Sequence, residues 1–296
     1  MRKTNILTAG AVRHRCHCVL TIILLFAASS AARAQTSHFA SAYYNRGNER
    51  YKKGDLDGAI SDFDAALTFD PRLAVAYNMR GCARYHKQDL DGSIADYTRA
   101  IELDPHMALA YYNRGRARDS KGDLDGSIAD YTRAIEINPH LVAAYNNRGN
   151  ARNDKGDLAG AMADFDRAIQ LDSRNALFYN NRGLVRRAQG DPQGAIADYD
   201  KAVKINPRLA VAYSNRGNAK QDVGNLNGSI ADYDSAIAID PSFAKAYANR
   251  GLARLLLGDR TGAEQDFNLC LALDPGLRAS LDKEIEKAKR RLPAGQ

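Results

Sequence analysis

The sequence predicts an all-α solenoid, a stack of seven helical hairpins that each span 34 residues. One glycine series keeps that spacing without a slip, and a tyrosine stands four residues before each member. A second glycine series has the same period, and an aromatic residue follows each member five positions later. The first series is Gly47, Gly81, Gly115, Gly149, Gly183, Gly217 and Gly251. Self-similarity at a period of about 20 to 50 residues is typical of repeat proteins whose units stack on one another.

Each repeat carries the signals of two helices. Helix A is expected over about positions 2 to 14 of the repeat and to end at a glycine such as Gly54, which readily adopts the left-handed conformation. Gln88 replaces this glycine in the second repeat. Asp or Asn follows and can cap helix B, whose apolar residues have the i, i+3, i+4 spacing of a buried face. Helix B stops before Asp-Pro or Asn-Pro in most repeats, and we expect this pair to begin the next helix A.

The predicted helices are too short to be stable alone, because isolated helices of roughly 12–15 residues barely hold in water. Glycine and alanine allow two helices to approach closely, and the aromatic residue of the partner helix fills the space between them. Stacking of successive hairpins then buries a continuous core. The last repeat needs a polar cover, and the charged amphipathic segment from Arg278 to Arg291 is expected to form it.

Over residues 40–277 the sequence resembles the tetratricopeptide repeat family. The resemblance implies a right-handed superhelix whose A helices line a concave groove that binds proteins or peptides. The sequence departs from the family where Leu is usual before the first glycine and Tyr is usual three residues after it, because Arg or Lys stands there in every repeat. The predicted organisation is a signal peptide (1–34), a lead-in (35–39), seven repeats (40–73, 74–107, 108–141, 142–175, 176–209, 210–243 and 244–277), and a capping helix and tail (278–296).

The repeating charges have two interpretations. An Asp on helix B recurs at the same spacing as the two cations of helix A. The charges can pair within and between neighbouring hairpins, with the arginine stems buried. Alternatively, the cations face the groove and bind an acidic partner. The recurring acids are Asp62, Asp96, Asp130, Asp164, Asp198, Asp232 and Asp266.

An asparagine row defines the candidate binding site, because the family places this position on the concave surface. The asparagine amide has donors and an acceptor that match a peptide group. The asparagine row resembles the asparagine ladder of O-linked N-acetylglucosamine transferases. The resemblance implies capture of an extended peptide by its backbone. Alternatively, the amides bond only to neighbouring helices. The predicted site residues are Asn45, Asn113, Asn147, Asn181, Asn215 and Asn249, with Tyr44 and Tyr112 at one end.

Leu252, Leu255 and Leu256 form an apolar cluster in the last repeat. We expect this cluster to pack against the capping helix. If that helix leaves it open, the cluster is a pocket for an apolar side chain of a partner.

The charge of the repeats argues against nucleic acid as a partner. The chain has a formal net charge of +7, but residues 1–34 contain five cations and no Asp or Glu. The remainder has 37 cations against 35 anions, whereas nucleic-acid-binding proteins usually keep a strong basic excess.

The first 34 residues have the pattern of a secretory signal peptide: basic residues, an apolar run and a final Ala32-Arg33-Ala34. The apolar run is about half the roughly 20 residues of a membrane-spanning helix. We therefore expect export to the periplasm or the exterior, with cleavage after Ala34. An uncleaved anchor is the alternative, and membrane contact is expected only in that case.

No catalytic or cofactor-binding motif is found in the sequence. Cys82 and Cys270 lie in distant repeats, and we expect them to be mostly buried free thiols. The sequence thus predicts no catalytic residue, no metal site, no cofactor and no small-molecule substrate. The predicted function is an exported scaffold for protein–protein or protein–peptide interaction. The alternative is a structural component of an envelope or secretion assembly, which acts through its convex face or by self-association at the leucine cluster.

Overall fold

Every secondary-structure element in the part of the chain that the structure describes, residues 35–290 of a computed structural model, is a helix. The predicted signal peptide (1–34) lies outside the described residues, as does the end of the predicted tail (291–296). The chain divides into two compact units, with the boundary between Asp123 and Leu124. The all-α class predicted from the repeats is confirmed.

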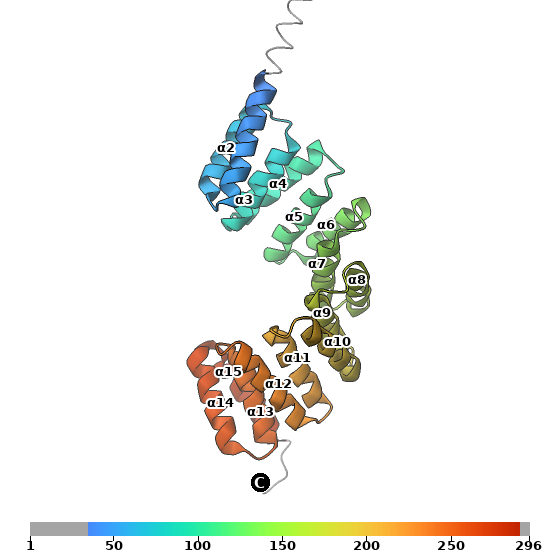
Figure 1. Ribbon diagram of the computed structural model, residues 1–296, viewed down its shortest axis with the longest axis vertical. Helices are drawn as coiled ribbons and strands as arrows, with labels where there is room; N and C mark the ends of the chain where they lie inside the picture. The colour runs from blue at the N-terminus through green and yellow to red at the C-terminus, as the bar shows by residue number, and fades with distance from the viewer. Residues whose placement is uncertain (1–34, 291–296) are drawn as a thin grey trace, which may run out of the picture. The chain divides into compact units, whose positions relative to one another are not determined.

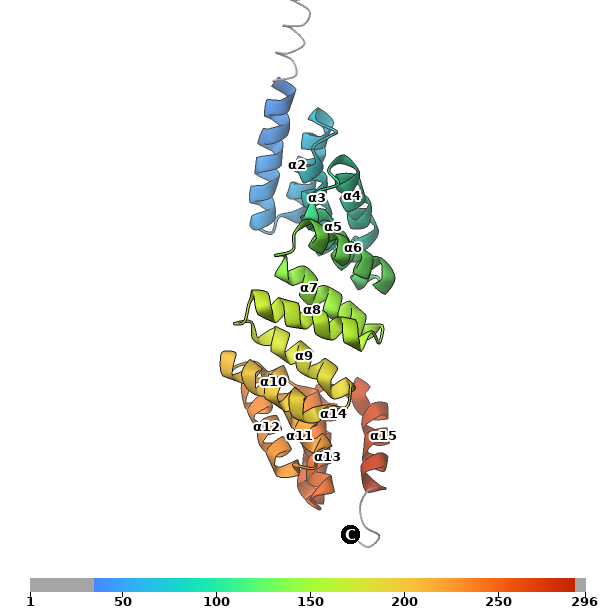
Figure 2. The same ribbon diagram turned by 90° about the vertical axis from the view of Figure 1, so that its right-hand side faces the viewer.

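Consecutive helices lie beside one another within each unit (Figure 1 and Figure 2). Unit 1 contains a helix over residues 35–52, then α2 (Leu56–Phe69), α3 (Ala74–His86), α4 (Leu90–Leu103) and α5 (Ala108–Ser120). Unit 2 contains α6 (Leu124–Ile137), α7 (Val142–Asp154), α8 (Leu158–Leu171), α9 (Ala176–Ala188), α10 (Pro192–Ile205), α11 (Ala210–Asp222), α12 (Leu226–Ile239), α13 (Ala244–Leu256), α14 (Arg260–Leu273), the short 3₁₀ helix η1 (Pro275–Leu277) and α15 (Arg278–Lys289).

The turn between helix A and helix B forms as the sequence predicts. At Gly54 the backbone is left-handed, with φ of +81°, and Gln88 takes the same conformation with φ of +64°. The next residue caps helix B: the Asp55 carboxylate accepts a hydrogen bond from the N–H of Gly58 at 2.9 Å. This bond satisfies one of the N–H groups that a helix start leaves without a partner.

The Asp-Pro pair at the end of helix B has a different role from the predicted one. Asp70 is extended, and its side chain accepts from the N–H of Arg72 at 2.9 Å, two residues on. Pro71 lies in this turn, and α3 begins only at Ala74, without a side-chain cap. The prediction that the pair begins helix A is wrong for α3, because the Asp70 side chain closes a local turn and the helix starts three residues after Pro71.

Glycine and the aromatic residue make the close contact within a hairpin. A Cβ built on Gly183 of α9 would lie 2.7 Å from Cε1 of Tyr199 on α10, and the same geometry recurs between Gly47 and Phe63. The aromatic side chain is fully buried in both cases. Small core residues then join each hairpin to the next: Ala66 of α2 packs with Ala76 of α3.

Helix α15 covers the last hairpin. Leu255 of α13 is buried together with Ala288 of α15, and Leu252, Leu256 and Ile285 pack against them. The leucine cluster therefore packs against the capping helix, as expected from the sequence.

Candidate functional site

The repeated charges form an Arg–Asp ladder. In the hairpin of α9 and α10, Arg182 donates to Asp198 from Nε at 2.9 Å and from Nη2 at 2.6 Å. Only 3% of Asp198 is exposed, and its carboxylate also meets Arg186 at 3.2 Å. The same pairs within one hairpin are Arg46–Asp62, Arg80–Asp96, Arg148–Asp164, Arg216–Asp232 and Arg250–Asp266.

The ladder also links neighbouring hairpins. The remaining Nη1 of Arg182 donates to Asp166 of the preceding B helix at 2.7 Å. Thr132 takes the place of that acid for Arg148, whose Nη1 donates to the threonine hydroxyl at 3.0 Å. Each ladder guanidinium also lies 5.0 to 5.7 Å from the ring centre of the tyrosine three residues earlier, a cation–π distance. Pairing within and between hairpins is thus the interpretation that the geometry supports.

The predicted asparagines also contact the neighbouring repeat. The amide nitrogen of Asn215 donates to Asn180 at 2.9 Å, and that of Asn249 donates to Asn218 at 2.9 Å. Asn113 donates to Asn78 at 3.1 Å. Asn181 donates to Asn146 and Asn150, Asn147 accepts from Asn146, and Asn45 is exposed at the first repeat.

The asparagine carbonyls differ among repeats. Oδ1 of Asn181 accepts from the amide of Asn180 at 3.1 Å. By contrast, no donor in residues 35–290 reaches Oδ1 of Asn113, Asn215 or Asn249. The hydrogen bond that each side-chain Nδ2 donates to the preceding repeat still fixes the orientation of the side chain. Each is therefore an oriented acceptor on a half-buried side chain.

An exposed apolar side chain stands one helical turn before two of these acceptors, a feature that was not predicted from the sequence. Leu109, before Asn113, is 55% exposed, and Val211, before Asn215, is 38% exposed, whereas Lys245 takes this second position of the repeat before Asn249. Positions 2, 6 and 9 of an A helix share one face because they are four and three residues apart. We call this surface the A-helix face. The sequence does contain a sign of this face, because the apolar residue at the second position lies outside the set of positions that form the core.

The two predicted tyrosines have different surroundings. Tyr44 is half-buried and packs 6.0 Å from the ring of Phe63, within the first core cluster. Tyr112 lies on α5, with the guanidinium of Arg116 5.9 Å from its ring centre. Tyr44 is thus mainly a packing residue, whereas Tyr112 belongs to a cluster with a cation.

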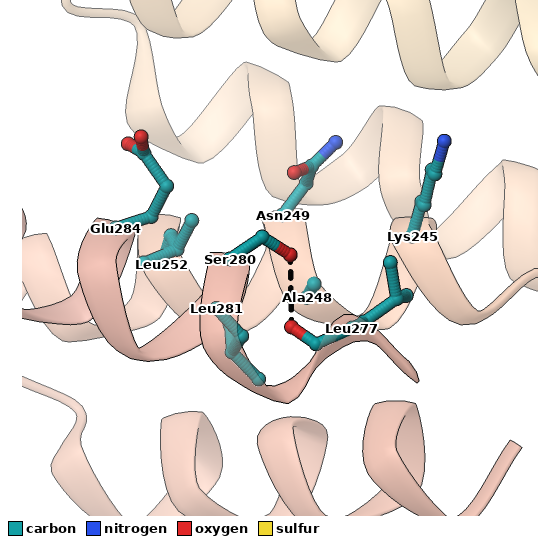
Figure 3. A pocket seen from close by; sticks show the side chains of 8 residues that line it. All are labelled: Lys245, Ala248, Asn249, Leu252, Leu277, Ser280, Leu281 and Glu284. Carbon is teal, nitrogen blue, oxygen red and sulfur yellow. Dashed lines mark hydrogen bonds between the residues drawn. The ribbon is translucent and has the colours of Figure 1, made fainter. Parts of the chain in front are cut away.

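A small pocket lies between α13 and α15 (Figure 3). Its apolar wall includes Ala248, Leu252 and Leu281, and its volume is about 190 Å³. The charged side chains of Lys245 and Glu284 lie at opposite ends (Figure 3). A pocket of this composition can take one apolar side chain, and Asn249 on its lining joins it to the A-helix face.

The two cysteine side chains of the described residues lie in different helices, Cys82 in α3 and Cys270 in α14. Cys82 is half-buried and Cys270 is buried, and both are free, as expected. Burial raises the pKa of the Cys82 thiol, so it is protonated near neutral pH. Within residues 35–290 no group of three or more His, Cys, Asp or Glu is placed to hold a metal ion. No helix among them has the length and apolar character to cross a membrane.

Solved structures share this architecture. A crystal structure of MamA is 28% identical over a match that covers 64% of this chain and 98% of MamA, with a TM-score of 0.50. A tetratricopeptide repeat protein from Parabacteroides merdae is 17% identical, with 85% of this chain and 99% of that chain covered and a TM-score of 0.67. YrrB, described as a protein of this repeat type with an unusual peptide-binding site, is 23% identical, with 64% and 97% covered and a TM-score of 0.50.

Family models agree with the structures along most of the chain. Models described as tetratricopeptide repeat match residues 40–73, 78–142 and 244–277. A model described as TPR repeat matches residues 149–190, 183–224 and 222–258. No curated protein gives a significant match. With its repeated hairpins and these matches, the chain belongs to the tetratricopeptide repeat family.

Proposed function

We propose that this protein is an exported, non-catalytic scaffold that holds extended segments of partner proteins along its A-helix face. Membership of a family whose proteins bind proteins or peptides supports the general role. The observation that carries the proposal is the presence of oriented carbonyl acceptors in each unit, at Asn113 in unit 1 and at Asn215 and Asn249 in unit 2, with an exposed apolar side chain one turn before Asn113 and before Asn215.

The chemistry of these acceptors suits a peptide backbone. A partner's N–H can donate to an asparagine Oδ1 that is already held in place, so little side-chain entropy is lost on binding. Each such bond contributes about 0.5–1.5 kcal/mol net. Leu109 beside Asn113 and Val211 beside Asn215 add apolar contact that is not specific for sequence. Capture would be modest in affinity and reversible.

The role of the acceptors is tested by replacing Asn215 and Asn249 with Ala together. Because two hydrogen bonds are lost, we expect binding of blocked peptides from a mixed-sequence array to weaken by about tenfold or more. Replacing Asn181 with Ala is the matched control, since its Oδ1 already accepts from Asn180. Affinities are measured by fluorescence anisotropy of labelled array peptides.

Backbone N-methylation of the same peptides makes this test specific. Methylated peptides cannot donate at the modified position, so wild-type protein should bind them more weakly, and the Asn215→Ala, Asn249→Ala protein should not distinguish them. Equal loss in both proteins, or equal affinity of wild-type protein for both peptides, would remove the asparagine acceptors from the proposal.

Export is the part of the proposal that rests on residues 1–34 alone. Amino-terminal sequencing of the protein recovered from the cell envelope or the medium should begin at Gln35. Recovery of an intact amino terminus in a membrane fraction would show an anchor instead, and recovery only from the cytosol would contradict export.

The alternative of an assembly component that self-associates at the leucine cluster gains no support, because Leu255 is buried against the protein's own α15. Attachment through the opposite surface of the solenoid is a separate possibility that no contact in residues 35–290 favours.

A further inference from the structure

One face of the first described helix, residues 35–52, is exposed although the later A helices bury the equivalent face. This helix, blue in Figure 2, lies at one edge of unit 1. Ala42, at the third position of the first repeat, is exposed. Arg46, at the seventh position, has 55% of its side chain exposed, against 12 to 16% for five later ladder arginines. The later residues at the third position are all buried: Ala76, Ala110, Ala144, Phe178, Ala212 and Ala246.

The contacts of α3 show what this face binds between repeats. Leu73 and Ala76 pack in one cluster with Leu67 of the preceding helix, α2. Nη1 of Arg80 donates to the carboxylate of Asp64 on the same α2. An A helix therefore uses an apolar residue, an alanine and an arginine to bind the B helix of the repeat before it.

The first helix presents the same three groups to solvent. Phe39, Ala42 and Arg46 hold the three equivalent positions, 34 residues earlier in the chain. Phe39 is 40% exposed, and its ring lies 5.4 Å from that of Phe69, which is also exposed. Arg46 donates to Asp62 from Nε and Nη2, but no acceptor among residues 35–290 reaches its Nη1. Because terminal units of repeat proteins usually carry a polar outer face, the exposed aromatic pair indicates a contact surface.

The B helices that pack on this face inside the protein share a short sequence. It consists of Asp, then Ala two residues later, then Leu, Ile or Val three residues after the Asp. Residues three apart share one side of a helix, so the acid and the apolar residue reach the neighbouring A helix together. In these interfaces the arginine Nη1 lies 2.5 to 2.7 Å from the acid. The four sets are Asp64-Ala66-Leu67, Asp166-Ala168-Ile169, Asp200-Ala202-Val203 and Asp234-Ala236-Ile237.

A second copy of this chain does not offer such a helix. Its earlier B helices, α2 to α12, are each covered by the A helix that follows. The last one, α14, has Asn268 in place of the acid and Cys270 in place of the alanine. Cys270 also packs with Leu281 of α15, so the capping helix occupies the surface that a further repeat would use. The complementary helix therefore belongs to a different protein.

We propose that the surface formed by Phe39, Ala42 and Arg46, which we call the first-repeat face, docks an amphipathic α-helix of a partner protein with the sequence Asp-x-Ala-(Leu, Ile or Val). This helix takes the place of a preceding B helix: its carboxylate binds Nη1 of Arg46, and its apolar residues cover Ala42 and Phe39. The site goes beyond the proposed function, since it binds a helix and not an extended segment. It also lies about a third of a turn around the helix from positions 2, 6 and 9 of the A-helix face.

A helical peptide copied from the chain itself provides the probe. Residues 192–205, which contain the Asp200 set, are synthesised with a hydrocarbon staple that keeps them helical, and binding is followed by fluorescence anisotropy. Asp200→Asn in the peptide should weaken binding about tenfold, as expected for loss of a charge-assisted hydrogen bond. Arg46→Gln in the protein should remove the difference between the two peptides. Arg72→Gln, which removes an exposed arginine of the same unit, should leave both affinities unchanged.

Ala42→Glu tests the face without disturbing the buried acid that Arg46 also binds. The new side chain lies four residues before Arg46 and can pair with it, so the helix stays stable while the face is blocked. Binding of the stapled peptide should fall at least tenfold, with an unchanged unfolding midpoint by circular dichroism. Absence of binding to the unmodified protein, or binding that survives Ala42→Glu, would overturn the first-repeat face. Loss in Asn113→Ala but not in Ala42→Glu would place the peptide on the A-helix face and would also overturn it.

Sedimentation equilibrium of the protein alone separates a partner helix from a second copy as the occupant. We expect a monomer at the concentrations of the binding experiment, because no B helix of another copy is available to the face. A dimer that Ala42→Glu dissociates would show that two copies meet through this face and would overturn a foreign helix as its ligand.

Discussion

Replacing Asp198 by Ala should lower the free energy of unfolding by about 3 kcal/mol. The carboxylate is buried and binds both Arg182 and Arg186, so its removal takes the buried anion from two guanidinium groups and leaves Arg182 only its more exposed partner Asp166. The cost falls at the low end for a broken buried pair because both arginine side chains keep part of their contact with water. Denaturant unfolding of the full chain, followed by circular dichroism, measures the change.

Asp166 provides a matched control for this prediction because it binds the third nitrogen of the same Arg182. Its side chain is 45% exposed, so Asp166→Ala should cost no more than about 1 kcal/mol, as for other exposed pairs. Asp198→Asn keeps the shape of the side chain and should retain part of the stability. Equal effects of the two alanine variants would mean that burial of the carboxylate does not set its contribution.

Replacing Gly183 by Ala should cost about 2 kcal/mol, although alanine is the better helix former. The new methyl group would lie 2.7 Å from Cε1 of Tyr199, and the ring cannot retreat because it is fully buried between the helices. Overpacking of this kind costs about 1–3 kcal/mol and outweighs the gain in helix propensity of up to about 1 kcal/mol. Denaturant unfolding again gives the measured value.

A second substitution separates the steric cause from a general loss of helix packing. Tyr199→Leu shortens the side chain that the alanine would strike, so the pair Gly183→Ala and Tyr199→Leu should cost less than the sum of the two single changes. Additive costs in this double-mutant cycle would show that the glycine and the ring do not oppose each other.

The Asp198 and Gly183 substitutions test different contacts of the same hairpin, α9 and α10. Glycine at position 183 sets how closely α9 and α10 approach, and Arg182 next to it ties that hairpin to the preceding one through Asp166. Because stability in a repeat protein is roughly a sum of unit and interface terms, either change should act mainly on its own and adjacent hairpins.

Departures from the usual family pattern are explained by this network. Arg stands where the family usually has Leu, and the structure shows why the fold tolerates it: the guanidinium is held by a buried Asp on helix B and by the face of a tyrosine one turn earlier. The arginine stem covers apolar surface while its head completes an ion-pair network. The arginine thus occupies a position that is usually apolar in the family, while its charge is paired with a buried acid.

The sequence by itself determined the local structure, because helix periodicity, capping by Asp55 and the left-handed turn at Gly54 depend only on neighbouring residues. Self-similarity also placed Arg182 and Asp198 at a fixed repeat spacing. Pairing between them was one of the two interpretations that the sequence left open. The role of Asp70 could not be predicted in this way, because the same acid can cap a helix or close a turn.

Tertiary structure alone decided which polar groups remain available. Asn181 and Asn215 are equivalent in sequence, yet only the second keeps its carbonyl oxygen without a donor in residues 35–290. Arg116 is one of many arginines in sequence, and one of the two tyrosine rings beside it belongs to Tyr85, about 30 positions away. Availability for binding depends on contacts between helices of neighbouring repeats, which the sequence of a single repeat does not contain.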